Sequence, residues 1–181
     1  MIKIEIKKGS KVSEHFKRNW NKIIYKTFKS PPLEDFSKDI FFKIKDGRKI
    51  VAVGALAPVK IKYKEKDYNI LGITEIISLI KRKGYGKILM KAISDYVKKT
   101  GKTSFGFTGN KTSPFYEKSG LKVKKNMLKK FVYQPKNEKE KQEVERALKR
   151  DGNVIYIEGK DKLISKVSSS KSKAQLPCMY W

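Results

Sequence analysis

The chain has 181 residues, which suits one domain or a tightly joined pair, and its 39% hydrophobic content can supply a core. Aromatic residues make up 11% of the chain and apolar runs occur at 50–56 and 70–80, so disorder throughout is excluded. Forty-four Lys and Arg residues against 18 Asp and Glu give a formal net charge of +26, which favours acidic ligands, phosphates included.

The excess of basic residues has two explanations that the composition leaves open. Five of the 44 basic residues are Arg and the other 39 are Lys. Lysine carries a hydrated point charge and lacks the planar fork with which arginine grips guanine or phosphate. The excess is therefore either a compositional bias or the electrostatic footprint of a nucleic-acid-binding module.

Cys178 is the only cysteine and His15 the only histidine, which excludes a disulfide framework and a zinc site of Cys and His ligands. We therefore expect no metal site. The first six residues alternate apolar and charged side chains, which is typical of a strand and not of a signal peptide. No apolar stretch reaches the roughly 18 residues of a membrane helix. We expect a soluble, cytoplasmic protein.

The first half of the sequence predicts one helix among four strands. Isoleucine at every second position indicates the first strand, and Ser13 is placed to cap a helix that stops before Pro31. The pair Asp46-Gly47 suits a tight hairpin. The expected elements are a strand at 2–6, a helix at 14–30, an acidic loop at 33–39, and strands at 40–45, 49–64 and 68–80.

The second half predicts helices and strands in alternation. Apolar residues at helical spacing after Gly84 mark the clearest helix of the chain, and Asn137 with Glu140 is typical of a capping box. The Ser- and Lys-rich segment 160–173 should be mobile, whereas the apolar residues from Leu176 onward should dock. The expected elements are helices at 84–100, 113–118 and 137–150, and strands at 103–108, 121–133 and 154–157.

The densest chemical signal is a strand that leads through a basic cluster and two glycines into an amphipathic helix. Glycines let backbone amides approach a ligand, and the first turn of a helix offers unpaired N–H groups and partial positive charge. Four side chains add full positive charges. The pattern predicts an anion site formed by Lys81, Arg82, Lys83, Gly84, Tyr85, Gly86 and Lys87.

This segment resembles the coenzyme-A loop of the GNAT superfamily of acetyltransferases, which reads Arg/Gln-x-x-Gly-x-Gly/Ala and opens the central helix. Lys81-Arg82-Lys83-Gly84-Tyr85-Gly86 matches it except at the first position, where Lys81 replaces Arg or Gln. Residues 113–121 resemble the family's second motif, a helix and strand with a Phe-Tyr pair, although Leu121 replaces an aromatic residue. The resemblance covers roughly residues 40–133.

The resemblance implies an α/β fold with a mixed, mostly antiparallel central sheet and helices on both faces. It also implies that the sheet splays near Leu79, so that the pantetheine of acetyl-CoA lies between strands. We expect one domain over 1–181, with a charged helical insertion at about 137–150 and a polar segment at 160–173 before an apolar C-terminus.

One branch of the family, the aminoglycoside 2'-N-acetyltransferases, is similar in further respects. The similar positions are a Glu before the strand that contacts acetyl-CoA, a Phe-Tyr tyrosine, an Asp-Gly turn into a late strand, and a terminal Trp. In this chain they read Thr74-Glu75-Ile76-Ile77-Ser78-Leu79, Phe115-Tyr116, Asp151-Gly152-Asn153-Val154 and Cys178-Met179-Tyr180-Trp181.

Three residues are candidates for acid–base chemistry. Glu75 shares an apolar strand face with Ile77, where burial of a carboxylate raises its pKa unless a lysine pairs with it. A carboxyl group with a raised pKa can accept the proton of an attacking amine, and the resemblance favours this role. The resemblance also implies that Tyr116 protonates the leaving thiolate, the alternative being packing beside Phe115. Trp181 supplies a terminal carboxylate as an alternative base.

The remaining implied contacts are with the cofactor, acetyl-CoA. Strand amides around Ile77, Ser78 and Leu79 would bind the pantetheine, and the loop 81–87 would bind the diphosphate. Asn110 would either hydrogen-bond the pantetheine or cap the helix that follows it.

The expected function is direct transfer of acetyl from acetyl-CoA to a primary amine of a small molecule in a ternary complex. An aminoglycoside-like acceptor, a polyamine and a protein N-terminus all remain open, and Glu34, Asp35, Asp39 and Glu75 offer local attraction for a cation. The alternatives are a nucleic-acid-binding module and a non-catalytic acetyl-CoA sensor. A homodimer is compatible with the sequence.

Overall fold

The structure is a computed structural model that describes residues 1–29, 32–33, 35–135, 137–150 and 152–177. It divides into two compact units: unit 1 comprises Met1–Ala57 and Thr74–Ala92, and unit 2 comprises Pro58–Ile73 and Ile93–Trp181. Strands β3 (Lys49–Tyr63) and β4 (Lys66–Ser78) and helix α2 (Tyr85–Thr100) contribute residues to both units. The single domain over 1–181 stays a prediction.

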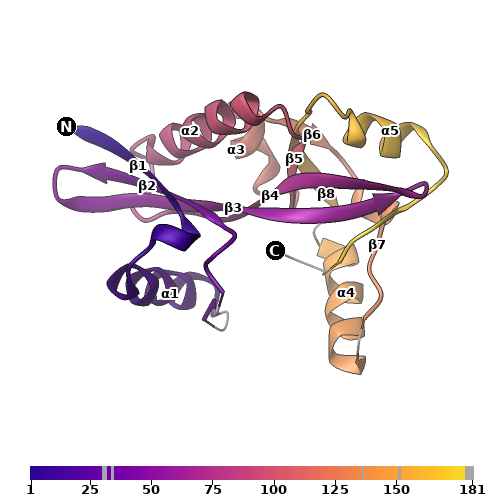
Figure 1. Ribbon diagram of the computed structural model, residues 1–181, viewed down its shortest axis with the longest axis horizontal. Helices are drawn as coiled ribbons and strands as arrows, with labels where there is room; N and C mark the ends of the chain where they lie inside the picture. Colours follow the sequence, from indigo (N-terminus) through magenta and orange to yellow (C-terminus); the bar gives the residue numbers. More distant parts are fainter. Residues whose placement is uncertain (30–31, 34, 136, 151, 178–181) are drawn as a thin grey trace. The chain divides into compact units, whose positions relative to one another are not determined.

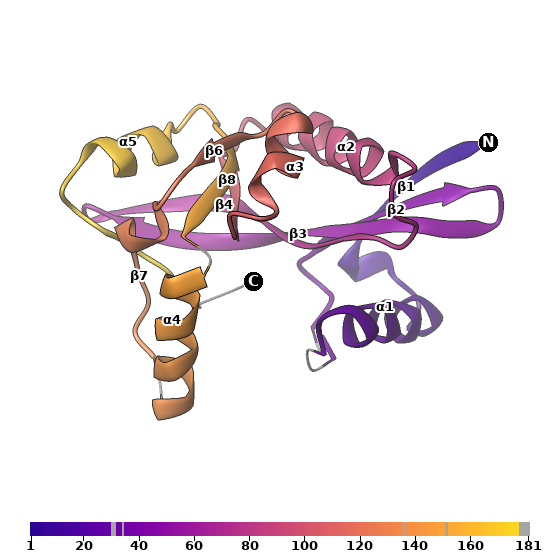
Figure 2. The same cartoon turned by 180° about the vertical axis from the view of Figure 1, so that it is seen from behind.

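Unit 1 is built on an antiparallel ladder of β1 (Ile2–Lys8), β2 (Ile40–Asp46) and the first part of β3. Asp46 pairs with Lys49 across the predicted hairpin. After the short turn η1 (Gly9–Lys11), helix α1 (Glu14–Phe28) begins where expected, because the Ser13 side chain accepts a hydrogen bond from the amide of Phe16 at 3.3 Å. Within unit 1, α1 and the first part of α2 lie on opposite faces of this sheet (Figure 1 and Figure 2).

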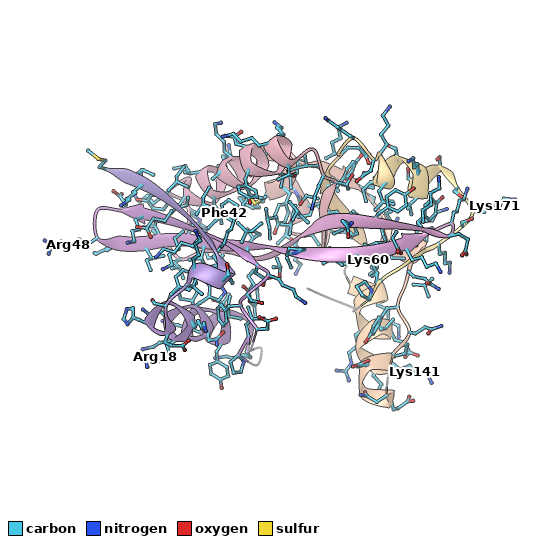
Figure 3. The ribbon with its side chains drawn as sticks, viewed as in Figure 1. Arg18, Phe42, Arg48, Lys60, Lys141 and Lys171 are labelled. Atoms are coloured by element: carbon cyan, nitrogen blue, oxygen red, sulfur yellow. The ribbon has the colours of Figure 1, made fainter. Side chains whose placement is uncertain are left out.

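Aromatic side chains form the core between α1 and the sheet. Trp20 stacks on Phe16 with ring centroids 5.6 Å apart and meets Phe41 of β2 edge-on at 4.7 Å. Figure 3 shows Phe42, the next residue, inside unit 1, while Arg48 projects from the tip of the β2–β3 hairpin. The buried members of the cluster are Phe16, Trp20, Ile24, Phe36, Phe41, Val53, Ala55 and Ile77.

A close backbone approach fixes the segment that leads into β2. The amide of Gly9 donates a 2.7 Å hydrogen bond to the carbonyl of Asp39, and a Cβ at Gly9 would lie 1.4 Å from the carbonyl oxygen of Phe36. Only glycine fits at that distance. The contact anchors residues 36–39 against the end of β1 and thereby places the side chain of Asp39.

Unit 2 contains the mixed part of the sheet. β4 pairs in parallel with β5 (Ser104–Thr108) through Leu71–Ser104 and Gly72–Phe105, the last pair of that ladder. β5 pairs antiparallel with β8 (Asn153–Ile157), which pairs antiparallel with β6 (Lys122–Lys124), as Figure 2 shows. The predicted class, a mixed and mostly antiparallel sheet with helices, is confirmed.

The long strand predicted at 121–133 is wrong. The chain there forms β6, the turn η2 (Leu128–Lys130) and the two-residue strand β7 (Phe131–Val132). Asn126 explains the break, because its φ is +54° and its amide donates to the buried side chain of Asn153 at 3.1 Å. A bonded turn therefore replaces the middle of the expected strand.

The Ser- and Lys-rich segment at 160–173 is also more ordered than predicted, since it contains helix α5 (Leu163–Ser169). Three apolar side chains of α5 are buried, and the carboxylate of Glu158 accepts hydrogen bonds from the first amides of the helix, Ile164 at 2.9 Å and Ser165 at 3.1 Å. Burial of a few residues and a capped N-terminus are enough to order this segment.

The remaining elements agree with expectation. Helix α3 (Ser113–Lys118) ends before Gly120, and α4 (Glu138–Arg150) begins after Asn137, whose side chain accepts from the amide of Glu140 at 2.9 Å. The apolar end of the chain docks as far as Leu176, which follows β9 (Ala174–Gln175) and donates to the Val132 carbonyl at 2.8 Å. None of the described helices is long and apolar enough to cross a membrane.

Candidate functional site

Glu75 lies on β4 in unit 1, beside the aromatic core. Its Oε2 accepts a 2.6 Å hydrogen bond from Nε1 of Trp20, a buried residue of α1. The φ of Glu75 is +54°, a left-handed conformation that residues with a side chain seldom adopt inside a strand. Thr74, Glu75 and Ile76 are all half-buried, where a regular strand would alternate. The local distortion holds the carboxylate against the tryptophan.

Two carboxyl groups of unit 1 have a raised pKa, and the charge of Asp39 contributes to the raised pKa of Glu75. Burial raises the pKa of Glu75 to about 7, the hydrogen bond from Trp20 lowers that pKa in part, and the charge of Asp39 raises it. Burial also raises the pKa of Asp39 to about 6, and the charge of Asp35 adds to the effect. Glu75 therefore changes its charge near neutral pH, as a general base requires.

The alternative in which Glu75 is neutralised by a lysine does not hold for the described part of the chain. Acidic residues that do pair with lysine are easy to find in unit 1: Glu5 lies 3.0 Å from Lys45, and Glu14 lies 2.6 Å from Lys17. Glu75 has Trp20 as its hydrogen-bond partner instead. A neutral donor satisfies the carboxylate without supplying the charge that would depress its pKa.

The end of β4 differs from the predicted pantetheine-binding strand in one respect. The amide of Leu79 donates to the Val51 carbonyl of β3 at 2.9 Å, so it is not free for a ligand. The amide of Ile80, one residue later, lies 3.4 Å from the same carbonyl, so two consecutive amides are directed to β3. The Ser78 hydroxyl donates to the Ile80 carbonyl at 2.8 Å and closes the turn that follows. The side chain of Ile77 is buried in the aromatic cluster.

The loop that follows has the donors that a diphosphate requires. Lys81, Arg82, Lys83 and Lys87 are all exposed. Gly84 has a φ of +78°, which favours glycine, and α2 begins at the next residue. Within the described chain, the amides of Tyr85 and Gly86 donate to no recorded backbone acceptor, whereas Lys87 donates to Gly84 at 3.0 Å. Full charges and free amides therefore gather at one helix N-terminus, and this donor set fits a diphosphate.

The side chain of Tyr85 has a structural role that the sequence did not indicate. Its hydroxyl donates a 2.7 Å hydrogen bond to Oδ2 of Asp46, at the β2–β3 hairpin. Asp46 also lies 3.3 Å from the N-terminal amine of Met1. The phenol therefore fixes the start of α2 to the sheet of unit 1, and the backbone amide of Tyr85 remains the candidate ligand group.

Tyr116 lies on α3 in unit 2 and is half-buried. Its ring meets that of Phe115 edge-on, with centroids 5.0 Å apart, so the packing alternative holds for the ring. Burial raises the pKa of Tyr116 to about 12, which keeps the phenol protonated at neutral pH. The hydroxyl is therefore a hydrogen-bond donor throughout the physiological range.

Asn110 neither caps α3 nor stands alone. Its Oδ1 accepts a 2.9 Å hydrogen bond from Nδ2 of Asn153, which also donates to Ser113 at 2.8 Å. The Thr112 side chain, at the N-cap position of α3, forms no capping bond. The capping prediction for Asn110 is therefore wrong, because a buried asparagine on β8 engages its side chain. Pantetheine binding by Asn110 stays a prediction.

Three asparagines, Asn110, Asn126 and Asn153, border a polar pocket of unit 2 with a volume of about 420 Å³. Asn153 is the buried centre of its wall, and Asn126 and Asn110 are held to it by hydrogen bonds. This network has no signature in the sequence, because its members come from three separate segments. The lining residues are Asn110, Ser113, Pro114, Glu117, Lys125, Asn126 and Asn153.

Trp181 and Cys178 lie outside the described residues, so the terminal carboxylate stays a predicted alternative base. His15 is described: it is exposed on α1, where its Nε2 lies 2.8 Å from Nδ2 of Asn19. The sequence does not indicate Trp20 as a site residue, because it looks like any apolar residue of a helix stripe. It places Asp39 among the acids that attract a cation, but it does not indicate that the charge of Asp39 acts on Glu75.

No protein-family profile matches the sequence, and a search of curated proteins also finds no match. Solved structures do share the fold. A conserved Enterococcus faecalis protein of unknown function superposes with a TM-score of 0.54 at 14% identity, over 67% of this chain and 32% of its own length. An acyl-CoA N-acyltransferase from Pseudomonas aeruginosa gives 0.55 at 11% identity, over 70% of this chain and 92% of that chain.

A third structure, from Desulfovibrio desulfuricans and assigned to the GNAT family of acetyltransferases, gives a TM-score of 0.52 at 13% identity. The match covers 87% of this chain and 98% of that one. The fold of this chain is that of the GNAT N-acetyltransferases. None of the three structures is described as an aminoglycoside acetyltransferase, and the narrower resemblance to that branch stays a prediction.

Replacing Glu75 by Gln should stabilise the protein above neutral pH. The pKa of Glu75 is about 7 in the folded chain and 4.5 in the unfolded chain. The contribution of Glu75 to stability is therefore full below pH 4.5 and is lost as the pH rises through 7. Gln keeps an oxygen for Trp20 and removes the titration. We expect Glu75→Gln to exceed the wild type by on the order of 2 kcal/mol at about pH 8, with partial exposure allowed for.

The measurement is the free energy of unfolding in urea at about pH 8 and at pH 4.5, where the two proteins should converge. Glu14→Gln, at an exposed position of the same unit, is the matched control and should show no such pH-dependent gain. A Glu75→Gln protein that is less stable than the wild type at the higher pH would contradict the raised pKa.

Proposed function

We propose that the protein is an acetyl-CoA-dependent N-acetyltransferase that acts on a primary amine of a small molecule. The observation that carries the proposal is the half-buried carboxyl of Glu75, with a pKa of about 7, on a strand of a GNAT fold. A structural carboxylate in a chain with this many lysines would be expected to pair with one of them. The raised pKa suits a group that exchanges protons near neutral pH.

Acetyl-CoA, when bound, would supply the acetyl group activated as a thioester. The loop 81–87 would hold its diphosphate through exposed cationic side chains and the amides of Tyr85 and Gly86. The amide of Leu79 is bonded to β3, so Ile77 and Ser78 remain the proposed strand contacts for the pantetheine.

Glu75 would accept the proton that the acceptor's ammonium group must lose before its nitrogen attacks. An alkylammonium has a pKa of about 10.4, so transfer to a carboxylate with a pKa of 4.5 is uphill by about 6 units, or about 8 kcal/mol. Transfer to Glu75, with a pKa of about 7, is uphill by about half as much. Burial of the carboxyl thus makes it a more effective base.

Tyr116 would donate a hydrogen bond to the leaving sulfur. A phenol with a pKa of about 12 holds its proton more tightly than a thiol, whose pKa is about 8.5, so complete transfer from Tyr116 is unfavourable. The carbon–nitrogen bond forms as the carbon–sulfur bond breaks, and the second proton lost by the nitrogen neutralises the sulfur. Tyr116 would stabilise the negative charge that develops on the sulfur before that proton arrives.

The acceptor would be cationic, because Glu75 and Asp39 form the local acidic environment. The surface as a whole is strongly basic and repels such a substrate at long range. At a Debye length of about 8 Å, a local pair of carboxyl groups can outweigh distant lysines. An aminoglycoside-like amine belongs to this class, as the sequence resemblance implies, and the terminal carboxylate of Trp181 is the alternative base.

A lysine-lined pocket of about 450 Å³ in unit 2 supports a second candidate function, binding of nucleic acid. Lys166 Nζ lies 5.5 Å from the ring centroid of Tyr68, and Tyr63 donates to the Lys166 carbonyl at 3.1 Å. Lysines beside an aromatic ring are typical of single-strand binding. The lining residues are Tyr63, Lys64, Lys66, Tyr68, Lys166, Ser169 and Ser170.

The proposed enzyme should release thiol from acetyl-CoA in the presence of the right amine, and its two assigned residues should matter. We expect Glu75→Gln to lower kcat by about 10²-fold or more, and Tyr116→Phe to lower it by about 10²-fold. The acid limb of the pH profile should lie near 7 and move to lower pH in Asp39→Asn, because the Asp39 charge raises the pKa of Glu75. The measurement is thiol release over a panel of amines.

Glu14→Gln and Tyr25→Phe, both at exposed positions of α1, are the matched controls and should keep full turnover. Full turnover by both Glu75→Gln and Tyr116→Phe would overturn the role assignments. Tight binding of acetyl-CoA with no turnover on any amine would favour the sensor, and binding of a random oligonucleotide with indifference to acetyl-CoA would favour the nucleic-acid-binding module.

The loop should bind acetyl-CoA by local geometry and not by net charge. The double variant Arg82→Ala/Lys83→Ala should weaken acetyl-CoA binding by about tenfold or more, because charge-assisted contacts to phosphate are lost. The control Lys98→Ala/Lys99→Ala removes the same net charge from the last turn of α2 and should leave the affinity within about twofold. Calorimetry measures both. Equal losses in the two double variants would refute a local site.

A further inference from the structure

Strand β1 is an edge strand of unit 1: in the part of the chain that the structure describes, β2 is its only neighbour in the sheet. Figure 1 shows it at the margin of that sheet. The amide of Gly47 donates to the Met1 carbonyl at 3.2 Å, and the amide of Gly9 donates to the Asp39 carbonyl at 2.7 Å. Odd-numbered residues of β1 are therefore the ones bonded to β2, and the backbone groups of even-numbered residues point away from it.

Three of the four even-numbered residues of β1 are isoleucines, and their side chains are unusually open to solvent. Ile2, Ile4 and Ile6 are 41%, 46% and 45% exposed. Across the ladder they sit next to Ile44 and Phe42 of β2, which are completely buried. The apolar face of the sheet thus extends beyond the buried residues of β2 and ends in three solvent-exposed isoleucines. An edge with free backbone groups and an apolar face is a template for another strand.

We infer that this edge pairs with β1 of a second copy of the chain, antiparallel, about a twofold axis at Ile4. In this register Ile4 faces Ile4 of the second copy and Ile2 faces Ile6. The outward backbone groups of the two strands then form about six hydrogen bonds, two for each facing isoleucine pair. The isoleucine rows continue one another, and each buries the other's exposed side chains.

Charge on the opposite face selects this register. The odd-numbered side chains place Lys3 opposite Glu5 of the second copy, and the twofold axis repeats the pair. A slip of two residues one way would put Lys3 opposite Lys3, and the other way Glu5 opposite Glu5. A slip of one residue would place the free backbone groups of one strand opposite residues of the second copy whose backbone groups are already bonded to its own β2. The sequence Ile-Lys-Ile-Glu-Ile is self-complementary in one register alone.

The main opposing force is repulsion between two chains that each carry a net charge of +26. Salt screens that long-range repulsion, since the Debye length falls from about 10 Å to about 3 Å between about 0.1 M and about 1 M salt. The isoleucine contact and backbone hydrogen bonds are short-ranged and lose much less. Self-association through β1 should therefore strengthen as salt is added, which is the opposite of what binding to nucleic acid would show.

Sedimentation equilibrium over a range of protein and salt concentrations tests the proposal. The mass should rise from 20.9 kDa toward twice that value, more readily at high salt. Lys3→Glu should weaken the dimer by about tenfold or more, because Glu then faces Glu5 at two symmetric positions. The exchange variant Lys3→Glu/Glu5→Lys restores opposite charges and should restore the dimer. Circular dichroism checks that each variant is folded.

A cysteine placed on the axis gives a second, independent readout. In a Cys178→Ser background, Ile4→Cys should form an intermolecular disulfide under mild oxidation, because facing Cα atoms of a bonded pair lie about 5.5 Å apart. Ile2→Cys faces residue 6 instead of itself and should not cross-link. A protein that stays monomeric at all concentrations would overturn the inference, and so would a dimer that Lys3→Glu leaves unchanged or that cross-links equally through both cysteines.

Discussion

The hydrogen bond from Trp20 to Glu75 is the constraint on which the proposed chemistry depends. It joins the centre of the aromatic core to the one carboxyl that β4 turns toward it, across 55 positions of sequence. Because the donor is a neutral indole, the bond fixes the carboxylate without neutralising it. Burial raises the pKa of this carboxyl to about 7, in a chain whose 39 lysines could have paired with it. The core serves both to stabilise unit 1 and to position the proposed base.

Charge acts at two ranges in this protein. Its total, +26, attracts anions to the whole surface, but the proposed sites depend on what lies within a few ångströms. At the N-terminus of α2 the nearby groups are cationic side chains and free amides, which suit a diphosphate. Around Glu75 the charge that acts on the carboxyl is that of Asp39, and a pair of acids suits an amine. One strongly basic chain can therefore offer local environments that suit both an anionic and a cationic ligand.

Sequence patterns predicted the elements whose signal is local and periodic. The Asp46-Gly47 hairpin, the Ser13 cap and α2 follow from turn chemistry, capping and a single apolar stripe. The anion site at 81–87 stays a prediction. Predictions failed where distant segments decide the outcome. The strand expected at 121–133 breaks because a buried asparagine of β8 holds the turn at Asn126, and Asn110 is engaged by the same residue. The bond of Leu79 to β3 is likewise a tertiary fact.

The most direct test of this constraint is a titration of the Glu75 carboxyl itself, followed by carbon-13 NMR with Glu75→Gln as the assignment reference. We expect a midpoint near 7, and a higher midpoint in Trp20→Phe, because the lost hydrogen bond lowers the pKa in the wild type. A midpoint near the ordinary 4.5 in the wild type, unchanged in Trp20→Phe, would contradict it.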